Sequence, residues 1–329
     1  MARIKEEDYL YICTRIKALE RNMLTREKLR QMVSAKSEED ALKVLQDAGW
    51  QLSTLAGAEN AITARRKETL ELLYRYAPDR RVIDLFRLKY DYHNAKVYVK
   101  AQAQGMEAPD LYSDAGTVPP AVLRRSLTEH KEGGVPKNLY DAALAAEDLL
   151  ARTRDPQQSD VLLDQAMAVR MLTLAKEAGS RFLLSYVQLY IDGCNLRVAV
   201  RAARAEKSTE YLRRALSEGG TVSTHRLQGE LTPELLQKLF GRGELSKAAE
   251  VAGEALLGRG DLAALDKYCD DALMEHLKSA RLMPFNEAQV AAYLLAVENE
   301  LTAVRTILAG RKAHVPEERL LEKLRESYV

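Results

Sequence analysis

The chain repeats itself at an interval of about one hundred residues, and this repeat limits its possible folds more than any other feature. The segment NAKVYVKA, which begins at Asn94, recurs 101 residues later as NLRVAVRA, which begins at Asn195. Asp91, three residues before the first segment, is matched at the same distance by Asp192. Short solenoid repeats have periods of roughly 20–50 residues, so a unit of this length is a small module of several helices.

A second pair of segments shows nearly the same interval. Residues 113–118 (SDAGTV) recur 104 residues later as residues 217–222 (SEGGTV), and in both copies a leucine follows five residues after the valine. An apolar residue, a capping residue and a leucine recur with this spacing at 24–29. Residues 300–305 (ELTAVR) are a weaker third copy of the segment that begins at Asn94. The repeat therefore occurs three times.

Three modules follow from this period. Pro109 and Gly219-Gly220 lie near the expected boundaries, and both residue types interrupt helical hydrogen bonding. We therefore predict helical modules at 1–108, 109–212 and 213–329. Three similar modules in one chain suggest a pseudo-threefold body around a central axis, and an open arc of modules would use the same sequence pattern.

The apolar residues have the spacing of α-helices. Leu85, Leu88, Tyr92, Ala95 and Val99 follow one another at steps of three and four, which places five apolar side chains on one face of a helix. Strict alternation of the kind typical of strands is scarce, and no Asn-Gly or Asp-Gly hairpin turn separates β-branched runs. We predict an all-α fold.

Capping residues mark several of the expected helix starts. A side chain that can accept a hydrogen bond from the first turn is followed by proline at the first helical position, or by an acidic residue three positions later. The pairs are Asp155 with Pro156, Thr232 with Pro233, and Ser37 with Asp40.

Charge and cysteine content exclude several classes of protein. Lys and Arg number 49 against 48 Asp and Glu, so no overall field attracts nucleic acid or an anionic membrane. Cys13, Cys194 and Cys269 fit neither a disulfide framework nor a C-x-x-C site, which favours a reducing cytosol. The N-terminus lacks the apolar core of a signal peptide. The longest run without a charged residue is the eleven of 48–58, short of the ~20 that a membrane-spanning helix needs.

Motifs of catalysis and cofactor binding are absent from the sequence. It contains no G-x-x-x-x-G-K-[ST] phosphate loop, no H-E-x-x-H pair and no G-x-S-x-G elbow. Its five histidines lie far apart, which argues against a metal site. We therefore predict a chain that is not an enzyme, with no catalytic, cofactor-binding or metal-binding residues, no cofactor and no small-molecule substrate.

Basic residues at helical spacing are the one charge feature that suggests a binding surface. Lys96 and Lys100 in the first copy of the repeat match Arg197 and Arg201 in the second, and Arg204 extends the second stripe. Because the positions are equivalent, both stripes can face one region and bind acidic side chains of a partner. The alternative is a solvated helix face whose charges pair with nearby acids.

Two parts of the chain resemble a known family. Residues 84–96 (DLFRLKYDYHNAK) are similar to the signature segment of the C-subunit family of V/A-type ATPases, which includes the eukaryotic d subunit. Residues 284–312 and 317–329 resemble the end of the same family. The likeness spans nearly the whole chain and is weakest at about 128–160.

The resemblance implies a funnel-shaped helical protein of three similar bundles. Such a protein receives the central-stalk subunits of the D and F type on one side and caps the ring of proteolipid subunits on the other. It transmits torque for ATP-linked proton or sodium transport from the cytoplasmic face of the membrane, as a peripheral part of the complex. Catalytic and ion-binding residues belong to other subunits of the family.

A different class of function is compatible with an all-helical chain. A scaffold of the tetratricopeptide type would dock peptides in a groove, but its period of roughly 34 residues is absent. A helical enzyme would need a cluster of perturbed ionisable groups in a pocket, for which the sequence gives no sign. We therefore favour the rotor subunit, and its coupling ion, its direction of operation and the oligomeric state of the isolated chain stay open.

Overall fold

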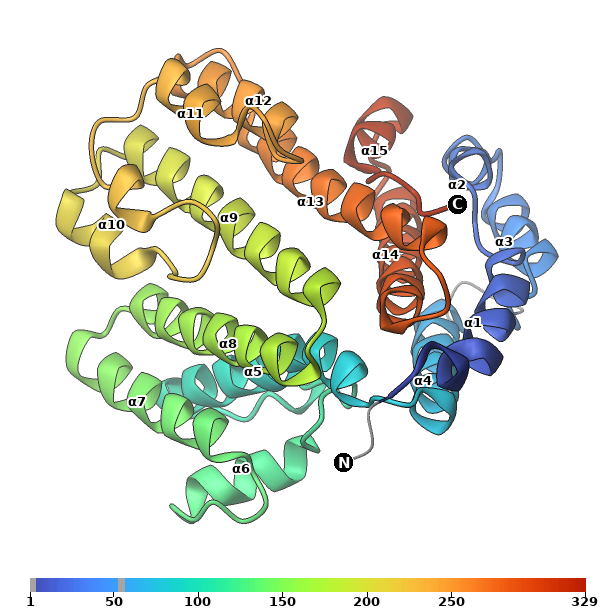
Figure 1. The fold of residues 1–329 in the computed structure, drawn as a ribbon, viewed down its shortest axis with the longest axis horizontal. Helices are drawn as coiled ribbons and strands as arrows, with labels where there is room; N and C mark the ends of the chain where they lie inside the picture. Colours follow the sequence, from blue (N-terminus) through green and yellow to red (C-terminus); the bar gives the residue numbers. More distant parts are fainter. Residues whose placement is uncertain (1–3, 53–56) are drawn as a thin grey trace. The chain divides into compact units, whose positions relative to one another are not determined.

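The structure is a computed structural model that describes residues 4–52 and 57–329 (Figure 1). α-Helices and short 3-10 turns are the regular elements of these residues, and no strand occurs among them, so the predicted all-α fold is confirmed. The contacts divide the chain into two compact units. Unit 1 comprises Met1–Ile83 and Ala263–Val329, and unit 2 comprises Asp84–Leu262. The division into modules at 108 and 212, with its threefold arrangement, stays a prediction.

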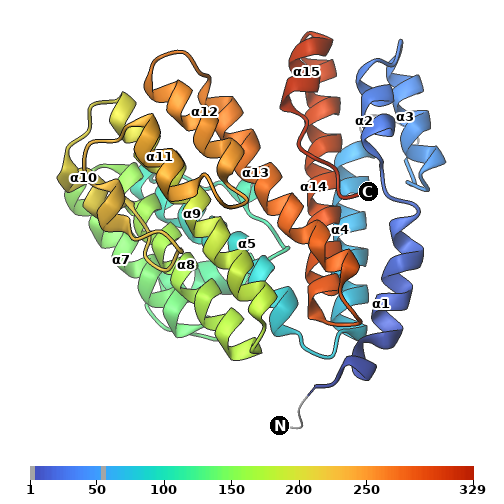
Figure 2. The same ribbon diagram turned by 45° about the horizontal axis from the view of Figure 1, so that its top comes forward.

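Unit 1 is formed by the two ends of the sequence. Its helices are α1 (Glu6–Glu20), α2 (Arg26–Val33), α3 (Glu38–Asp47), α4 (Ala58–Tyr76), α13 (Leu262–Ser279), α14 (Glu287–Lys312) and α15 (Glu317–Lys323). α14 packs against α1, α2, α4 and α15 (Figure 2). Sixteen of its 26 residues are buried, and four of these are alanines, whose small side chains let neighbouring helices approach closely. A helix that is apolar on nearly every side belongs in a core, and α14 is the central helix of unit 1.

Two buried ion pairs join α4 to α14. Arg65 lies 2.9 Å from Glu300, and Arg66 lies 2.8 Å from Glu298. Burial raises the pKa of the Glu300 carboxyl, and the charge of Arg65 partly offsets that shift. Since removing one partner of a buried pair leaves an uncompensated charge, these contacts fix how the two helices lie against each other.

Unit 2 contains the middle of the chain. Its helices are α5 (Arg81–Gln104), α6 (Pro120–Thr128), α7 (Lys137–Thr153), α8 (Pro156–Ala178), α9 (Arg181–Arg204), α10 (Thr209–Ala215), α11 (Pro233–Phe240) and α12 (Ser246–Leu256). The main helix contacts are α7 with α8, α8 with α9, α9 with α12 and α11 with α12. On α5 the predicted apolar face is buried, because all five of its side chains lie in the core: Leu85, Leu88, Tyr92, Ala95 and Val99.

The predicted helix starts are confirmed by their hydrogen bonds. In each case the capping side chain accepts from a backbone N–H of the first turn, which satisfies a donor that the helix itself leaves without a partner. Ser37 accepts from Asp40 at 3.1 Å, Asp155 from Gln157 at 2.9 Å, and Thr232 from Leu235 at 3.2 Å.

The segment around 128–160, where the family resemblance is weakest, is also helical. The loop that follows α6 is held by Ser126, whose hydroxyl donates to the carbonyl oxygens of Lys131 and Glu132. α7 then runs from Lys137 to Thr153, and Arg154, which follows it, adopts a left-handed conformation with φ of 54°. This segment therefore adds a regular helix to unit 2.

The buried pairs of unit 1 predict a difference between two substitutions. Arg66→Ala should lower the free energy of unfolding by about 3 kcal/mol, because Glu298 then stays buried without this partner. Glu59→Ala removes the exposed pair with Arg305 on the same two helices and should cost less than about 1 kcal/mol. Urea denaturation of both variants measures the difference, and equal losses would show that burial does not decide the strength of these pairs.

Candidate partner-binding site

The basic stripe predicted on α5 is paired with acids of the same unit. Lys96 Nζ lies 2.6 Å from Asp164 Oδ1, and Lys100 Nζ lies 2.7 Å from Asp160 Oδ2. Both carboxylates come from α8, and the two side chains of each helix are four residues apart. A partner that binds these lysines must share them with α8. Their role in partner binding stays a prediction.

The second predicted stripe lies along α9 and becomes more exposed toward the end of the helix. Arg197 is half-buried, whereas Arg201 and Arg204 in the last turn are exposed. Cations in the last turn of a helix interact favourably with its dipole. The exposed part of this stripe is therefore Arg201 and Arg204.

The short helix α10 extends the basic surface at the end of α9. α10 packs against α9, and Arg213 and Arg214 on it are exposed, as is Lys207 in the connecting loop. Two exposed carboxylates, Glu206 and Glu210, lie in the same stretch, and Glu210 pairs with both arginines of α10. Together with Arg201 and Arg204, this stretch of the chain carries five cations and two carboxylates, so its local charge is positive. We call these seven residues the basic end. Sequence reasoning missed the part on α10, although its residues follow within ten positions of Arg204.

Asp91 fastens a loop that returns across α5. Thr117 Oγ1 donates to Asp91 Oδ2 at 2.7 Å, and the backbone N–H of Val118 donates to Oδ1 at 3.0 Å. Asn94 exchanges two hydrogen bonds with the backbone of Ser113, at 2.8 and 2.9 Å. Burial raises the pKa of Asp91, and the bonds from Thr117 and Val118 oppose the shift. The loop is thereby held by side chains of the helix that it crosses.

The second copy of the repeat makes the same bonds on α9. The backbone N–H groups of Thr221 and Val222 donate to Asp192 at 2.9 and 3.2 Å, and Thr221 Oγ1 donates at 2.5 Å. Asn195 exchanges two bonds with the backbone of Ser217, both 2.8 Å long. The residues that match in sequence therefore have the same hydrogen-bond partners in the structure.

In unit 1 the corresponding carboxylate is Glu300 of α14. The backbone N–H of Leu24 donates to Glu300 Oε2 at 2.6 Å, just as Val118 and Val222 donate to the aspartates. The sequence match places Glu300 at the position of Asn94, whereas this bond places it at the position of Asp91. The third copy is therefore shifted by three residues from the predicted register, and a glutamate there carries the carboxylate that is an aspartate in the other copies.

The three helices that carry these carboxylates, α5, α9 and α14, end in the same way. The residue after the last turn has a positive φ at Gly105, Glu206 and His314. In each case the next N–H donates to a carbonyl five residues earlier: Met106 to Ala101, Lys207 to Ala202 and Val315 to Gly310. This pattern is a Schellman motif. Counted back from these ends, Asp91, Asp192 and Glu300 occupy the same position, which supports the corrected register.

The close approach of loop and helix predicts the effect of adding one methyl group. A Cβ on Gly116 would overlap Asp91, and one on Gly220 would overlap Asp192. Gly116→Ala and Gly220→Ala should therefore each lower stability by roughly 1–3 kcal/mol, as overpacking does. Gly229→Ala is the matched control, because nothing lies within 4 Å of its Cβ. Thermal unfolding measures the effect, and a control that loses as much would contradict this account.

An open groove of about 470 Å³ lies in unit 2 between the end of α5 and α6. Tyr98, Met106 and Tyr112 line it together with Arg124, whose guanidinium lies 5.6 Å from the centre of the Tyr112 ring. Burial raises the pKa of both tyrosines. The lining contains neither histidine nor cysteine, and its carboxylates are those of Glu107 and Glu129.

Two further properties concern metals and membranes. Within residues 4–52 and 57–329, no three His, Cys, Asp or Glu side chains are grouped so that they could hold a metal ion. None of the helices in these ranges combines the length and the apolar character needed to cross a membrane.

Comparison with known proteins gives a consistent result. The family model described as ATP synthase (C/AC39) subunit matches residues 12–323. The C subunit of the V-type sodium ATPase of Enterococcus hirae is 22% identical over 321 residues, which cover 95% of this chain and 97% of that protein. The C subunit of the A-type ATP synthase of Desulfurococcus sp. (strain SY) is 24% identical over 339 residues, covering 97% and 91%. The chain is thus similar along almost its full length to C subunits of both the V-type and the A-type complex.

Proposed function

This chain belongs to the ATP synthase (C/AC39) subunit family, and from that membership we propose that it couples the central stalk of a rotary ATPase to the ring in the membrane. Members of this family are structural subunits rather than enzymes, so the chain is a non-catalytic subunit of a V- or A-type ATPase. Its partners are other subunits of that complex. The observation that carries the proposal is the extent of the match, which leaves no large part of the chain for an unrelated activity.

The proposed mechanism is mechanical. Ion flow turns the ring of proteolipid subunits, this chain passes the rotation to stalk subunits of the D and F type, and the stalk drives conformational change in the catalytic subunits, or the reverse. The chain itself would lie on the cytoplasmic face of the membrane as a peripheral part of the complex. Contacts that resist shear need broad packed interfaces of about 1,200 Å² or more.

Internal stiffness is the property that a coupling part needs, and several contacts supply it. The buried pairs of Arg65 with Glu300 and Arg66 with Glu298 fix α4 on α14. Asp91 and Asp192 fasten the loops that cross α5 and α9. These contacts limit sliding of one element along another, so that a force on one helix moves its neighbours with it.

The basic end of unit 2 is the surface that we propose for the stalk. Arg201 and Arg204 are exposed, and α10 adds further cations, so an acidic face on the partner would be attracted and oriented there. Lys96, Lys100 and Arg197 are partly covered, whereas Arg201 and Arg204 are exposed. Their contribution would be smaller than that of the exposed arginines.

Purification of the complex tests the coupling role. A tagged copy of the chain in its native host, recovered after gentle solubilisation of membranes, should bring down stalk subunits, proteolipid and the catalytic subunits. Mass spectrometry identifies them. Recovery of the chain alone, or only with proteins unrelated to a rotary ATPase, would overturn the proposal and favour a scaffold.

Charge reversal tests the surface. Arg201→Glu combined with Arg204→Glu should weaken binding of the purified stalk several-fold and reduce the salt dependence of that binding. The matched control is Lys137→Glu combined with Arg152→Glu on α7, where both side chains are also exposed. Titration calorimetry measures the affinities, and circular dichroism checks the fold. Equal affinity for the two double variants would remove the basic end from the interface.

A further inference from the structure

The last helix of unit 1 is followed by a segment that corresponds to the loop after α10. α10 and α15 have seven residues each, and each begins three residues after the left-handed residue that ends the long helix. Leu216 follows α10 and Leu324 follows α15, and both side chains are buried. Residues 324–329, which we call the strap, therefore take the place of the loop that begins at Leu216.

The two segments differ in how they connect to the next group of helices. After α10 the chain continues without a break to Val222, which donates to Asp192. In unit 1 the residue that donates to the equivalent carboxylate is Leu24, near the other end of the sequence. The connection between the strap and the segment at Leu24 is therefore made by noncovalent contacts alone.

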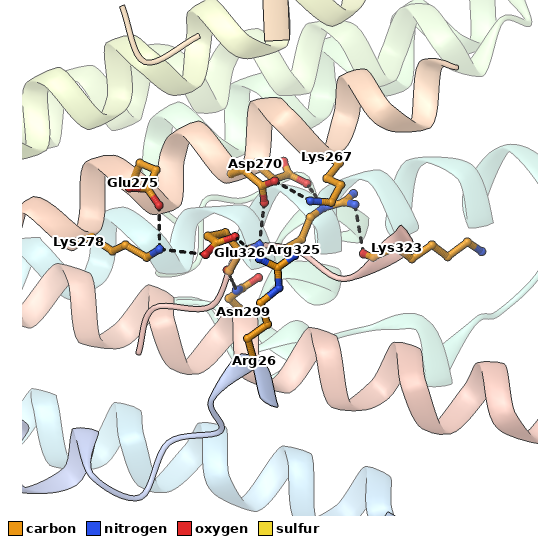
Figure 3. Close-up of polar contacts among 10 residues, drawn as sticks. Arg26, Lys267, Asp270, Glu275, Lys278, Asn299, Lys323, Arg325 and Glu326 are labelled. Carbon is orange, nitrogen blue, oxygen red and sulfur yellow. Dashed lines mark hydrogen bonds and ion pairs between the residues drawn. The ribbon is translucent and has the colours of Figure 1, made fainter. Parts of the chain in front are cut away.

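Polar contacts hold the strap on two long helices (Figure 3). Arg325 donates to Asp270 of α13 at 2.8 Å, and the backbone N–H of Glu326 donates to Asp271 at 2.7 Å. The backbone carbonyl of Glu326 accepts from Asn299 of α14 at 2.9 Å. Since both backbone groups of Glu326 have side-chain partners, this surface recognises the peptide backbone as well as its side chains.

The side chain of Glu326 links the two ends of the sequence. One of its oxygens lies 3.3 Å from Lys278 Nζ of α13, and the other lies 3.3 Å from Arg26 of α2. Figure 3 shows this carboxylate between the two cations. The Arg26 side chain is 48% exposed and those of Glu326 and Lys278 are 30% and 27% exposed, so these pairs are accessible to salt.

An aromatic side chain anchors the other end of the strap. Tyr328 is only 3% exposed, and burial raises the pKa of its phenol. The guanidinium of Arg281 lies 5.5 Å from the centre of the Tyr328 ring and also donates to the Tyr328 carbonyl oxygen at 3.3 Å. With Leu324 this gives two apolar anchors on either side of the charged pair Arg325 and Glu326.

We propose that the surface formed by α2, α13 and α14 is a peptide-binding site, that its ligand is the chain's own strap, and that the strap leaves and returns while the rest of unit 1 stays folded. The contacts support release because the polar ones are partly exposed and only two large apolar side chains are anchored in the core. They support return because the surface supplies matched charges and two backbone partners. The proposal does not depend on the coupling role of the chain.

Complementation in trans tests the site. A chain that lacks residues 324–329 should bind the fluorescein-labelled peptide LRESYV saturably in fluorescence anisotropy, whereas the full-length chain, whose site is occupied, should bind it far more weakly. Peptides with Glu326→Lys or Tyr328→Ala should bind at least about tenfold more weakly. Raising the salt from 0.1 M to 1 M shortens the Debye length from about 10 Å to about 3 Å and should weaken binding without abolishing it.

The opposite results would overturn the proposal. A truncated chain with native circular dichroism that does not bind the peptide, or that binds all peptides equally, has no such site. Concentration-dependent dimers of the full-length chain in light scattering, lost when the strap is deleted, would show that the strap binds a second copy instead.

If the truncated chain does not fold, hydrogen exchange of the full-length chain tests the proposal instead. Amides of the strap should exchange faster than those of α14 at 291–304, and Asp270→Ala should speed exchange in the strap while leaving α14 unchanged. Exchange of the strap only together with α14, at the rate of global unfolding, would show that the strap does not leave by itself.

Discussion

Near the middle of α5, α9 and α14, a carboxylate accepts a hydrogen bond from a backbone N–H that lies just before a short helical segment, and this bond holds that segment on the longer helix. A loop that crosses a helix brings backbone N–H groups into a partly buried place, where an unpaired donor costs about 1–3 kcal/mol. Asp91, Asp192 and Glu300 meet this need for Val118, Val222 and Leu24. With its starting residue held, the short helix that comes next can place its apolar side against the core. In units 1 and 2 alike, this bond helps to hold the segment that leads into the short helix.

The sequence repeat identified the first two of these positions as equivalent, without indicating their hydrogen bonds, and it misplaced the third. Asp91 and Asp192 lie at equal distances before Asn94 and Asn195, and both asparagines bond to the returning loop, so four polar residues preserve the register. α14 keeps only the carboxylate and places it on a longer side chain. Its donor, Leu24, lies 276 positions away, so no search at a fixed interval connects the two.

The basic stripes show that the spacing of charges along one helix does not identify what those charges bind. Positions four apart place Lys96 and Lys100 on one face of α5, but the same spacing suits a solvated face, a partner or a neighbouring helix. The structure shows that a neighbouring helix supplies the partners, because Asp160 and Asp164 have the same spacing on α8 and pair with the two lysines. The order is reversed between the helices: Lys96 pairs with Asp164 and Lys100 with Asp160. Such a match depends on whether the two helices run parallel or antiparallel and on their relative shift along the axis. The sequence of one helix does not encode either of these. On α9 the spacing predicted a stripe, and the position of Arg201 and Arg204 in its last turn leaves them exposed.

In unit 2 the connection from a long helix to the next group of helices is covalent, whereas in unit 1 the corresponding connection is noncovalent, and the two kinds of connection respond differently to force. In unit 2 each long helix continues through its loop into the next group of helices, so separating them would stretch the chain itself. In unit 1 the corresponding link consists of the bond from Leu24 to Glu300 and the contacts of the strap. Such a link opens at the free energy of its own contacts, which can lie well below that of global unfolding. The largely buried ion pairs between α4 and α14 strengthen the same unit, because removing one partner of such a pair leaves the other charge poorly solvated. A part that carries torque would therefore hold its shape through α14, while the strap can open without loss of that core.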